Sequence, residues 1–196
     1  KRGEMLANIV SLTKNIVVVG SHGKTTTTSL IASIFQETKI DPTIINGGVI
    51  NSLKSNAKLG HGDWAILEAD ESDGSFLKLP INYSIVTNLD HEHLDYYKNY
   101  GNLEKAFIEF INKTPPIGKS IICIDDKNIK NILFKIKNKN ILTYGFNKKA
   151  NYKISNVKYR LNYSLFDLNY KDLKNQKIKI KNINVRLIGK HNVLNS

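Results

Sequence analysis

Short apolar runs alternate with amphipathic stretches along the first 145 residues, and this alternation constrains the fold more than any other feature of the chain. Residues 15–20 are rich in β-branched side chains and end in glycine, and residues 24–37 follow with apolar side chains at helical spacing. Alternating strands and helices predict a parallel sheet covered by helices on both faces. We expect further strands at residues 43–45, 64–68, 83–87, 120–124 and 141–144, and helices at 102–112 and 127–136.

The pattern changes after Gly145. Three strand-like segments follow, near residues 151–160, 163–170 and 176–188, with turn residues between them and no helical stretch. We therefore expect a parallel α/β core at residues 1–145, a small antiparallel β subdomain at 146–188, and the start of a helix at 189–196. The chain begins with lysine and stops in that helix, so we expect it to be part of a longer protein.

Composition points to a soluble globular protein. Hydrophobic residues make up 41% of the chain, but no apolar run approaches the ~18 residues of a membrane span, and the N-terminus lacks the apolar core of a signal peptide. We expect a cytoplasmic protein without a membrane span. The single cysteine, Cys123, stands in an apolar strand-like run, and we interpret it as a buried hydrophobic residue rather than a nucleophile.

Charge is distributed unevenly. Residues 1–126 carry 12 basic and 15 acidic side chains, whereas residues 127–190 carry 17 basic and only 2 acidic ones. A basic region of this kind can bind a polyanion such as nucleic acid. However, in residues 177–187 lysine and asparagine alternate with isoleucine and valine, as in a strand with one solvated face. We favour a solvated strand over a nucleic-acid surface.

The segment between the first strand and the first helix carries the strongest functional signal. It reads Gly-Ser-His-Gly-Lys-Thr-Thr, and backbone N–H groups at a helix N-terminus form a natural anion site. The strict P-loop motif needs a glycine where this chain has Val18, so we predict a P-loop-type fold with a shortened phosphate loop. The candidate phosphate-binding residues are Gly20, Ser21, His22, Gly23, Lys24, Thr25 and Thr26, with Thr25 also able to ligate Mg²⁺.

Four carboxylates within residues 68–73 follow a predicted strand. Carboxylates this close repel one another unless a cation compensates them, and Mg²⁺ prefers carboxylates together with phosphates and water. We favour a metal site, with Glu68 as its best ligand, over a merely solvated turn.

Residues 86–95 combine two histidines with three carboxylates after another predicted strand. Zinc is disfavoured because no cysteine or further histidine cluster completes a four-ligand shell. A structural or solvated role is the simpler interpretation of His91.

Taken together, the motifs resemble the Mur ligase family. The resemblance spans essentially the whole chain and rests on five ordered segments, at residues 20–28, 46–48, 68–73, 86–95 and 189–195. It implies the family's central ATP-binding domain, which in family members stands between a UDP-sugar domain and a C-terminal domain. Residues 71–77 and the Val-Thr-Asn form at 86–88 are most similar to members that join L-alanine to UDP-N-acetylmuramate in peptidoglycan biosynthesis.

The resemblance also implies roles for single residues. Lys24 becomes the catalytic phosphate-binding lysine and Thr25 the ligand of a first Mg²⁺, while Glu68 and His93 become ligands of a second. Many relatives have proline where this chain has His91, so we align His93 by counting back from the Leu-Asp pair at 94–95. The residues that match the motif at the adenine end of ATP are His191, Asn192 and Asn195.

The implied reaction is ATP- and Mg²⁺-dependent amide formation through an acyl phosphate. Because the flanking domains would hold the sugar nucleotide and the amino acid, we expect this chain alone to lack ligase activity. Two alternatives stay open. One is the related ligase that joins a whole tripeptide to the same sugar nucleotide, and the other is a non-catalytic module that binds nucleotide or nucleic acid.

Overall fold

The computed structural model describes residues 2–50 and 53–196, so residues 1, 51 and 52 of the predicted core lie outside the described part. Within that part, ten strands form one sheet in the order β10-β9-β8-β7-β6-β5-β1-β4-β2-β3. The strands are β1 (Lys14–Val19), β2 (Thr43–Ile50), β3 (Ser55–Lys58), β4 (Trp64–Glu68), β5 (Tyr83–Val86), β6 (Lys119–Cys123), β7 (Ile141–Gly145), β8 (Tyr152–Tyr159), β9 (Ser164–Lys171) and β10 (Lys177–Val185).

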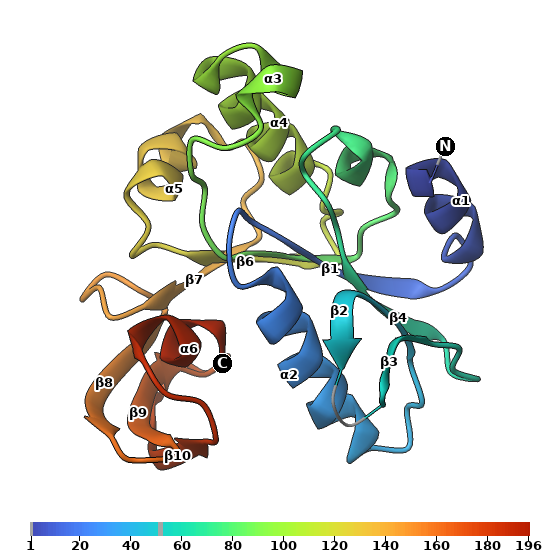
Figure 1. Cartoon of the computed structure of the whole chain (residues 1–196). Coiled ribbons are helices and arrows are strands. Elements are labelled where there is room, and N and C mark those ends of the chain that lie inside the picture. The colour runs from blue at the N-terminus through green and yellow to red at the C-terminus, as the bar shows by residue number, and fades with distance from the viewer. Residues whose placement is uncertain (1, 51–52) are drawn as a thin grey trace.

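Helices cover both faces of the parallel part of the sheet (Figure 1). Helices α3, α4 and α5 lie above it and α2 lies below it in this view. The helices of the described chain are α1 (Arg2–Ile9), α2 (Lys24–Gln36), α3 (Leu94–Tyr97), α4 (Tyr100–Asn112), α5 (Lys127–Ile132) and α6 (Lys190–Asn195), with single 3₁₀ turns η1 (Ser75–Lys78) and η2 (Leu133–Lys135). The predicted α/β class is confirmed.

Parallel pairing brings three functional segments to one edge of the sheet. Strand β1 lies between β4 and β5 and runs parallel to both, with Val18 opposite Glu68 on β4 and Ile85 on β5. Because parallel strands end at the same edge, the loops after β1, β4 and β5 lie side by side there. These loops carry the phosphate-loop motif, the acidic cluster and the histidine-containing segment.

The C-terminal strands are antiparallel, as predicted, but they extend the main sheet instead of forming a separate one. Strand β8 pairs in parallel with the end of β7, where Tyr144 lies opposite Tyr152, and β9 and β10 then add antiparallel strands. The predicted alternation of buried and exposed residues in β10 is broken by a bulge between Ile180 and Ile183. There Asn182 adopts a positive φ of 56° and donates its backbone N–H to Asp167.

The main core lies between the sheet and the helices above it. Helix α4 begins where the Asn99 side chain accepts a hydrogen bond from the Asn102 N–H, and it buries one apolar face. Phe76 from η1 packs against Phe107 and Phe110 of α4, with ring centroids 5.7 and 5.2 Å apart. All three rings are fully buried, so this cluster ties the segment after the acidic loop to the helix layer.

Several short elements were not predicted from the sequence. Helix α1, strand β3, turn η1 and helix α3 are short or weakly amphipathic, so tertiary contacts rather than local periodicity determine them.

Cys123 is buried as expected, and this burial raises the pKa of its thiol. Among the described residues, no helix is long and apolar enough to cross a membrane.

We expect Phe107→Ala to lower the free energy of unfolding by about 3–5 kcal/mol, because it removes a fully buried ring from the aromatic cluster. Phe134→Ala is the matched control, since its ring is 81% exposed, and it should cost less than about 0.5 kcal/mol. Urea unfolding followed by circular dichroism measures both. Equal losses in the two variants would contradict the assigned core.

Candidate active site

The phosphate-loop segment connects β1 to α2 as the sequence predicts. Gly20 and Gly23 both have positive φ, at 140° and 81°, which glycine adopts without strain. Gly23 precedes α2, and no side chain caps the helix N-terminus. The first N–H groups of α2 are therefore available to an anion, and Thr26 lies in this first helical turn.

The loop is held in place by residues that follow β5. The Asn88 side chain accepts from the His22 N–H at 2.7 Å and donates to the His22 carbonyl oxygen at 2.8 Å. Thr87 donates to that carbonyl oxygen at 2.7 Å, and Ser21 accepts from the Asp90 N–H at 2.8 Å. The Val-Thr-Asn segment thus supports the phosphate loop, a role that the sequence analysis did not predict.

Lys24 stands in the first turn of α2 with its ammonium group directed to two oxygen acceptors. It donates to the Gly20 carbonyl oxygen at 2.6 Å, and its Nζ lies 2.9 Å from a carboxylate oxygen of Glu71. Glu71 is almost fully buried and lies three residues beyond Glu68. Glu71 belongs to the acidic cluster at residues 68–73, but the sequence pattern does not distinguish it from its neighbours.

Thr25 and Glu68 lie together on the other side of the loop. The Thr25 hydroxyl donates to Glu68 Oε1 at 3.1 Å, and the second carboxylate oxygen accepts from the Gly47 N–H at 2.7 Å. A Cβ atom on Gly47 would lie only 2.7 Å from Glu68 Oε1, so glycine is needed for this close approach. A hydroxyl and a carboxylate are both hard oxygen donors of the kind that Mg²⁺ prefers.

His93 immediately precedes α3 and adopts a left-handed conformation, with φ at 58°. Its Nε2 atom lies 3.5 Å from Glu71 and 3.9 Å from Glu92, and ligand atoms of these three residues lie within 4.8 Å of one another. Glu68 and His93 both line the same cleft of about 860 Å³, but the carboxylates grouped with His93 are Glu71 and Glu92. The shared Glu68–His93 metal site therefore stays a prediction.

The other histidines near the loop make local contacts. His22 is exposed, and its Nε2 lies 3.1 Å from Asp90. The His91 ring stacks on Tyr100 with centroids 3.8 Å apart, which fits the structural role expected for it. Neither imidazole belongs to the group of potential metal ligands found among the described residues.

The short helix α6 brings the C-terminal motif to the phosphate loop. Thr27 of α2 donates to the Asn195 carbonyl oxygen at 3.2 Å, and a Cβ on Gly23 would lie 2.4 Å from the Asn195 side chain. Asn192 donates to the Ile188 carbonyl oxygen, and His191 is exposed at the start of the helix. Their expected role at the adenine end of ATP stays a prediction.

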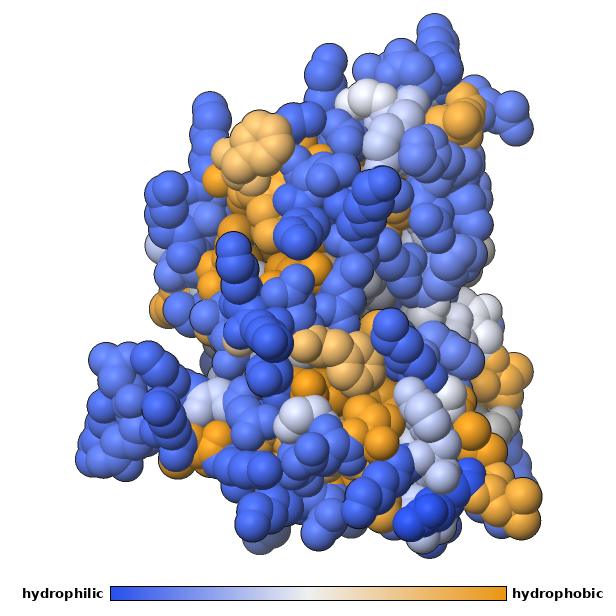
Figure 2. Space-filling view, turned by 90° about the vertical axis from the view of Figure 1, so that its left-hand side faces the viewer, coloured by the Kyte–Doolittle hydropathy of each residue, from blue (hydrophilic) through white to orange (hydrophobic). Residues whose placement is uncertain are grey.

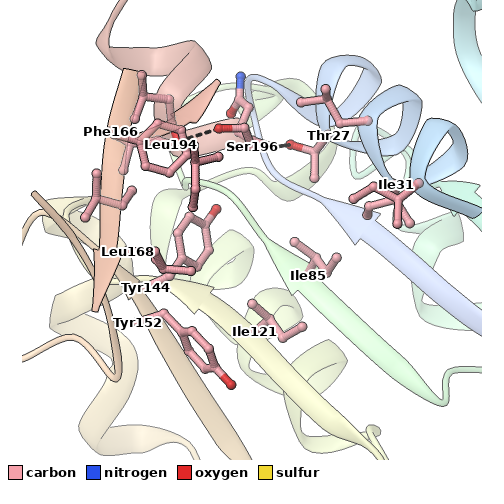
Figure 3. Close-up of a pocket in the computed structure, with 16 residues that line it drawn as sticks. Thr27, Ile31, Ile85, Ile121, Tyr144, Tyr152, Phe166, Leu168, Leu194 and Ser196 are labelled. Carbon is pink, nitrogen blue, oxygen red and sulfur yellow. Dashed lines mark hydrogen bonds between the residues drawn. The ribbon is translucent and has the colours of Figure 1, made fainter. Parts of the chain in front are cut away.

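A second groove runs beside α2 and has a different character. It has a volume of about 260 Å³ and lies between α2, the sheet face and the C-terminal strands. Figure 3 shows apolar side chains such as Ile31, Ile121 and Leu168 lining it, with Ser196 at its rim. None of the described residues that line this groove has a carboxylate, lysine or histidine side chain, so they lack the groups that phosphate or Mg²⁺ chemistry needs.

Comparison with known proteins places the chain in an enzyme family. A family model described as the Mur ligase middle domain matches residues 18–196. The UDP-N-acetylmuramate–L-alanine ligase of Pelagibacter ubique is 61% identical over all 196 residues, which cover 42% of that protein. The chain thus spans less than half the length of this curated relative.

Two solved structures share the fold. UDP-N-acetylmuramate-alanine ligase MurC of Thermotoga maritima superposes with a TM-score of 0.76 at 23% identity, over 98% of this chain and 41% of the other. The ligase from Neisseria that acts on UDP-N-acetylmuramate and L-alanyl-γ-D-glutamyl-meso-diaminopimelate gives a TM-score of 0.80 at 20% identity, over 98% of this chain and 62% of the other.

The loop glycines provide a test of the site geometry. We expect Gly20→Ala to destabilise the fold by more than about 1 kcal/mol, because φ is 140° and the added Cβ would lie 2.1 Å from the Thr87 hydroxyl. Gly101→Ala, inside α4 with only Asn99 nearby at 3.3 Å, should be neutral or stabilising. Thermal unfolding of both variants decides this, and a harmless Gly20→Ala would show that the loop geometry is wrong.

Proposed function

The chain belongs to the Mur ligase family, and from this membership we propose that it is the central nucleotide-binding domain of a UDP-N-acetylmuramate–L-alanine ligase. The observation that carries the proposal is the 61% identity to such a ligase along the whole chain. The phosphate loop, with its uncapped helix N-terminus and its inward-facing Lys24, supports ATP as the energy source. Because relatives are more than twice as long, the substrates and the complete activity are part of the proposal.

The donor atoms at the cleft fit Mg²⁺. Thr25 and Glu68 supply a hydroxyl and a carboxylate 3.1 Å apart beside the loop. His93 lies in the same cleft beside two further carboxylates, those of Glu71 and Glu92. We infer that Thr25, Glu68 and His93 hold Mg²⁺ there. When bound, Mg²⁺ offsets negative charge on phosphate oxygens and helps to align the reacting groups.

The proposed reaction joins two substrates in two steps. A carboxylate oxygen of UDP-N-acetylmuramate attacks the γ-phosphorus of ATP, which gives an acyl phosphate and ADP. The amine of L-alanine then attacks the acyl carbon, inorganic phosphate leaves, and the amine loses a proton. The α2 N-terminus and Lys24 contribute by positioning the phosphates and stabilising negative charge during transfer.

A panel of amines in the complete ligase tests the substrate. ATP-dependent product with UDP-N-acetylmuramate and L-alanine supports the proposal, and product only with a tripeptide would indicate the recycling ligase instead. Binding of DNA or RNA without ligation would favour the nucleic-acid alternative, for which the lysine-rich C-terminal strands are the candidate surface. Figure 2 shows the face of the molecule that lies on the left in Figure 1, where these strands are found. Hydrophilic residues predominate on this face, and hydrophobic residues gather in its lower part.

We expect Lys24→Ala to lower the ligation rate at least about 100-fold in the complete enzyme, because the transferring phosphoryl group loses a positioned positive charge. The exposed Lys39→Ala variant removes the same charge outside the cleft and should keep the parent rate. Phosphate release coupled to product formation measures both. Turnover of Lys24→Ala above roughly a tenth of the parent rate would contradict the assignment.

We also expect the 196-residue chain alone to bind Mg·ATP weakly and to form no amide bond. Its phosphate loop and metal-binding side chains lie within the described residues, whereas we assign the sugar-nucleotide and amino-acid surfaces to the flanking domains of its relatives. Without these surfaces the reactants are not held in contact. Calorimetry with Mg·ATP and a phosphate-release assay with both substrates test this, and substrate-dependent release by this chain would refute it.

A further inference from the structure

Glu71 is a buried carboxylate for which the proposed reaction has no use. Its side chain is 1% exposed, although it lies in the loop after β4, from which Asp70 and Asp73 line the polar cleft. Burying a carboxylate is costly unless a cation compensates it. The compensating cation here is Lys24, whose Nζ atom lies 3.1 Å from Oε1 and 2.9 Å from Oε2.

The contacts of Lys24 determine how its ammonium group is oriented. An ammonium group has three N–H bonds in a fixed tetrahedral arrangement. One bond is directed to the Gly20 carbonyl oxygen at 2.6 Å and a second to the Glu71 carboxylate. The third has no acceptor among the described residues, and Lys24 lines the cleft in which we place the phosphates.

Glu71 is itself held firmly. Its backbone carbonyl oxygen accepts a hydrogen bond from the buried Tyr97 hydroxyl and another from the Gly74 N–H. Burial raises the pKa of the Tyr97 phenol well above its ordinary value, so this hydroxyl stays a donor. Glu71 is therefore fixed to α3 through Tyr97, while its carboxylate contacts α2 through Lys24.

We propose that Glu71 is a positioning residue that, together with Gly20, orients the Lys24 ammonium so that its remaining N–H bond is directed to the transferring phosphoryl group. The inference rests on the proposed ligase function. A flexible lysine side chain can place its charge over several ångströms, and a misplacement of about 1 Å can cost about 100-fold in rate. Glu71 removes that freedom before the nucleotide binds.

A metal-ligand role is the main rival, because Glu71, Glu92 and His93 lie close enough to share an ion. The geometry favours positioning. Both Glu71 oxygens lie nearer to Lys24 than the 3.5 Å that separates Oε1 from His93 Nε2. A carboxylate already paired with a lysine is a poor ligand for a second cation.

The test compares Glu71→Gln with the parent in the complete ligase. Glutamine keeps the shape and an oxygen acceptor but removes the charge. We expect kcat to fall about 10- to 100-fold, while the Mg·ATP dissociation constant stays within about threefold or decreases, since Lys24 then attracts phosphate more strongly. The Mg²⁺ concentration for half-maximal activity should stay within about twofold. Asp41→Asn is the matched control, because Asp41 forms a Lys58 ion pair outside the cleft, and it should keep the parent kcat.

If Glu71→Gln fails to fold, Tyr97→Phe keeps the ring and removes only the hydrogen bond that holds Glu71. We expect it to lower kcat about three- to tenfold with unchanged Mg·ATP affinity. Three results in whichever variant folds would each overturn the positioning role. These are a kcat equal to that of the parent, a loss of Mg·ATP affinity as large as the loss of kcat, and a large rise in the Mg²⁺ concentration needed for half-maximal activity. A parent enzyme without ligase activity would overturn the proposed function itself, so the two failures are distinguishable.

Discussion

The site depends on the parallel pairing of β1 with β4 on one side and β5 on the other. This pairing ends three strands at one edge and brings together loops that are distant in sequence. The loop after β5 holds the phosphate loop through Asn88. The last residue of β4, Glu68, contacts Thr25, and the loop that follows supplies Glu71 to Lys24. Each of these contacts spans more than 40 residues of sequence, so none would form without the strand order.

Much of this arrangement is visible in the sequence, because the relevant signals are local. A β-branched run ending in Gly20, followed by Gly-Lys-Thr and a helical pattern, predicts the strand, the loop and the helix without any tertiary information. The role of Glu71 could not be predicted, since four nearby carboxylates look alike until the fold shows which one is buried. The role of Asn88 could not be predicted either, because its hydrogen-bond partner His22 lies 66 residues away in the sequence.

The uneven charge of the chain reflects the different surroundings of its two halves. Carboxylates concentrate in the half that surrounds the cleft, where Lys24 and the proposed Mg²⁺ compensate them. Lysines concentrate in the C-terminal strands, where Lys177, Lys179 and Lys181 are exposed and the Asn182 bulge interrupts the alternation. There Lys179 pairs with Asp167, whose pKa is lowered to about 2 by hydrogen bonds from Asn156 and Asn182 and by Lys179. These strands therefore present exposed lysines to solvent, with an ion pair between Lys179 and Asp167.

We propose that the edge formed by β1, β4 and β5 binds the nucleotide phosphates with their metal. The most direct measurement is paramagnetic broadening of backbone amide signals when Mn²⁺ replaces Mg²⁺ in the complex with ATP. If this edge binds the phosphates, we expect the strongest broadening at residues 20–26, with clear effects around Glu68, Glu71 and His93 and little change in β8–β10. Broadening centred on the lysine-rich strands β8–β10, with the phosphate loop unaffected, would contradict it.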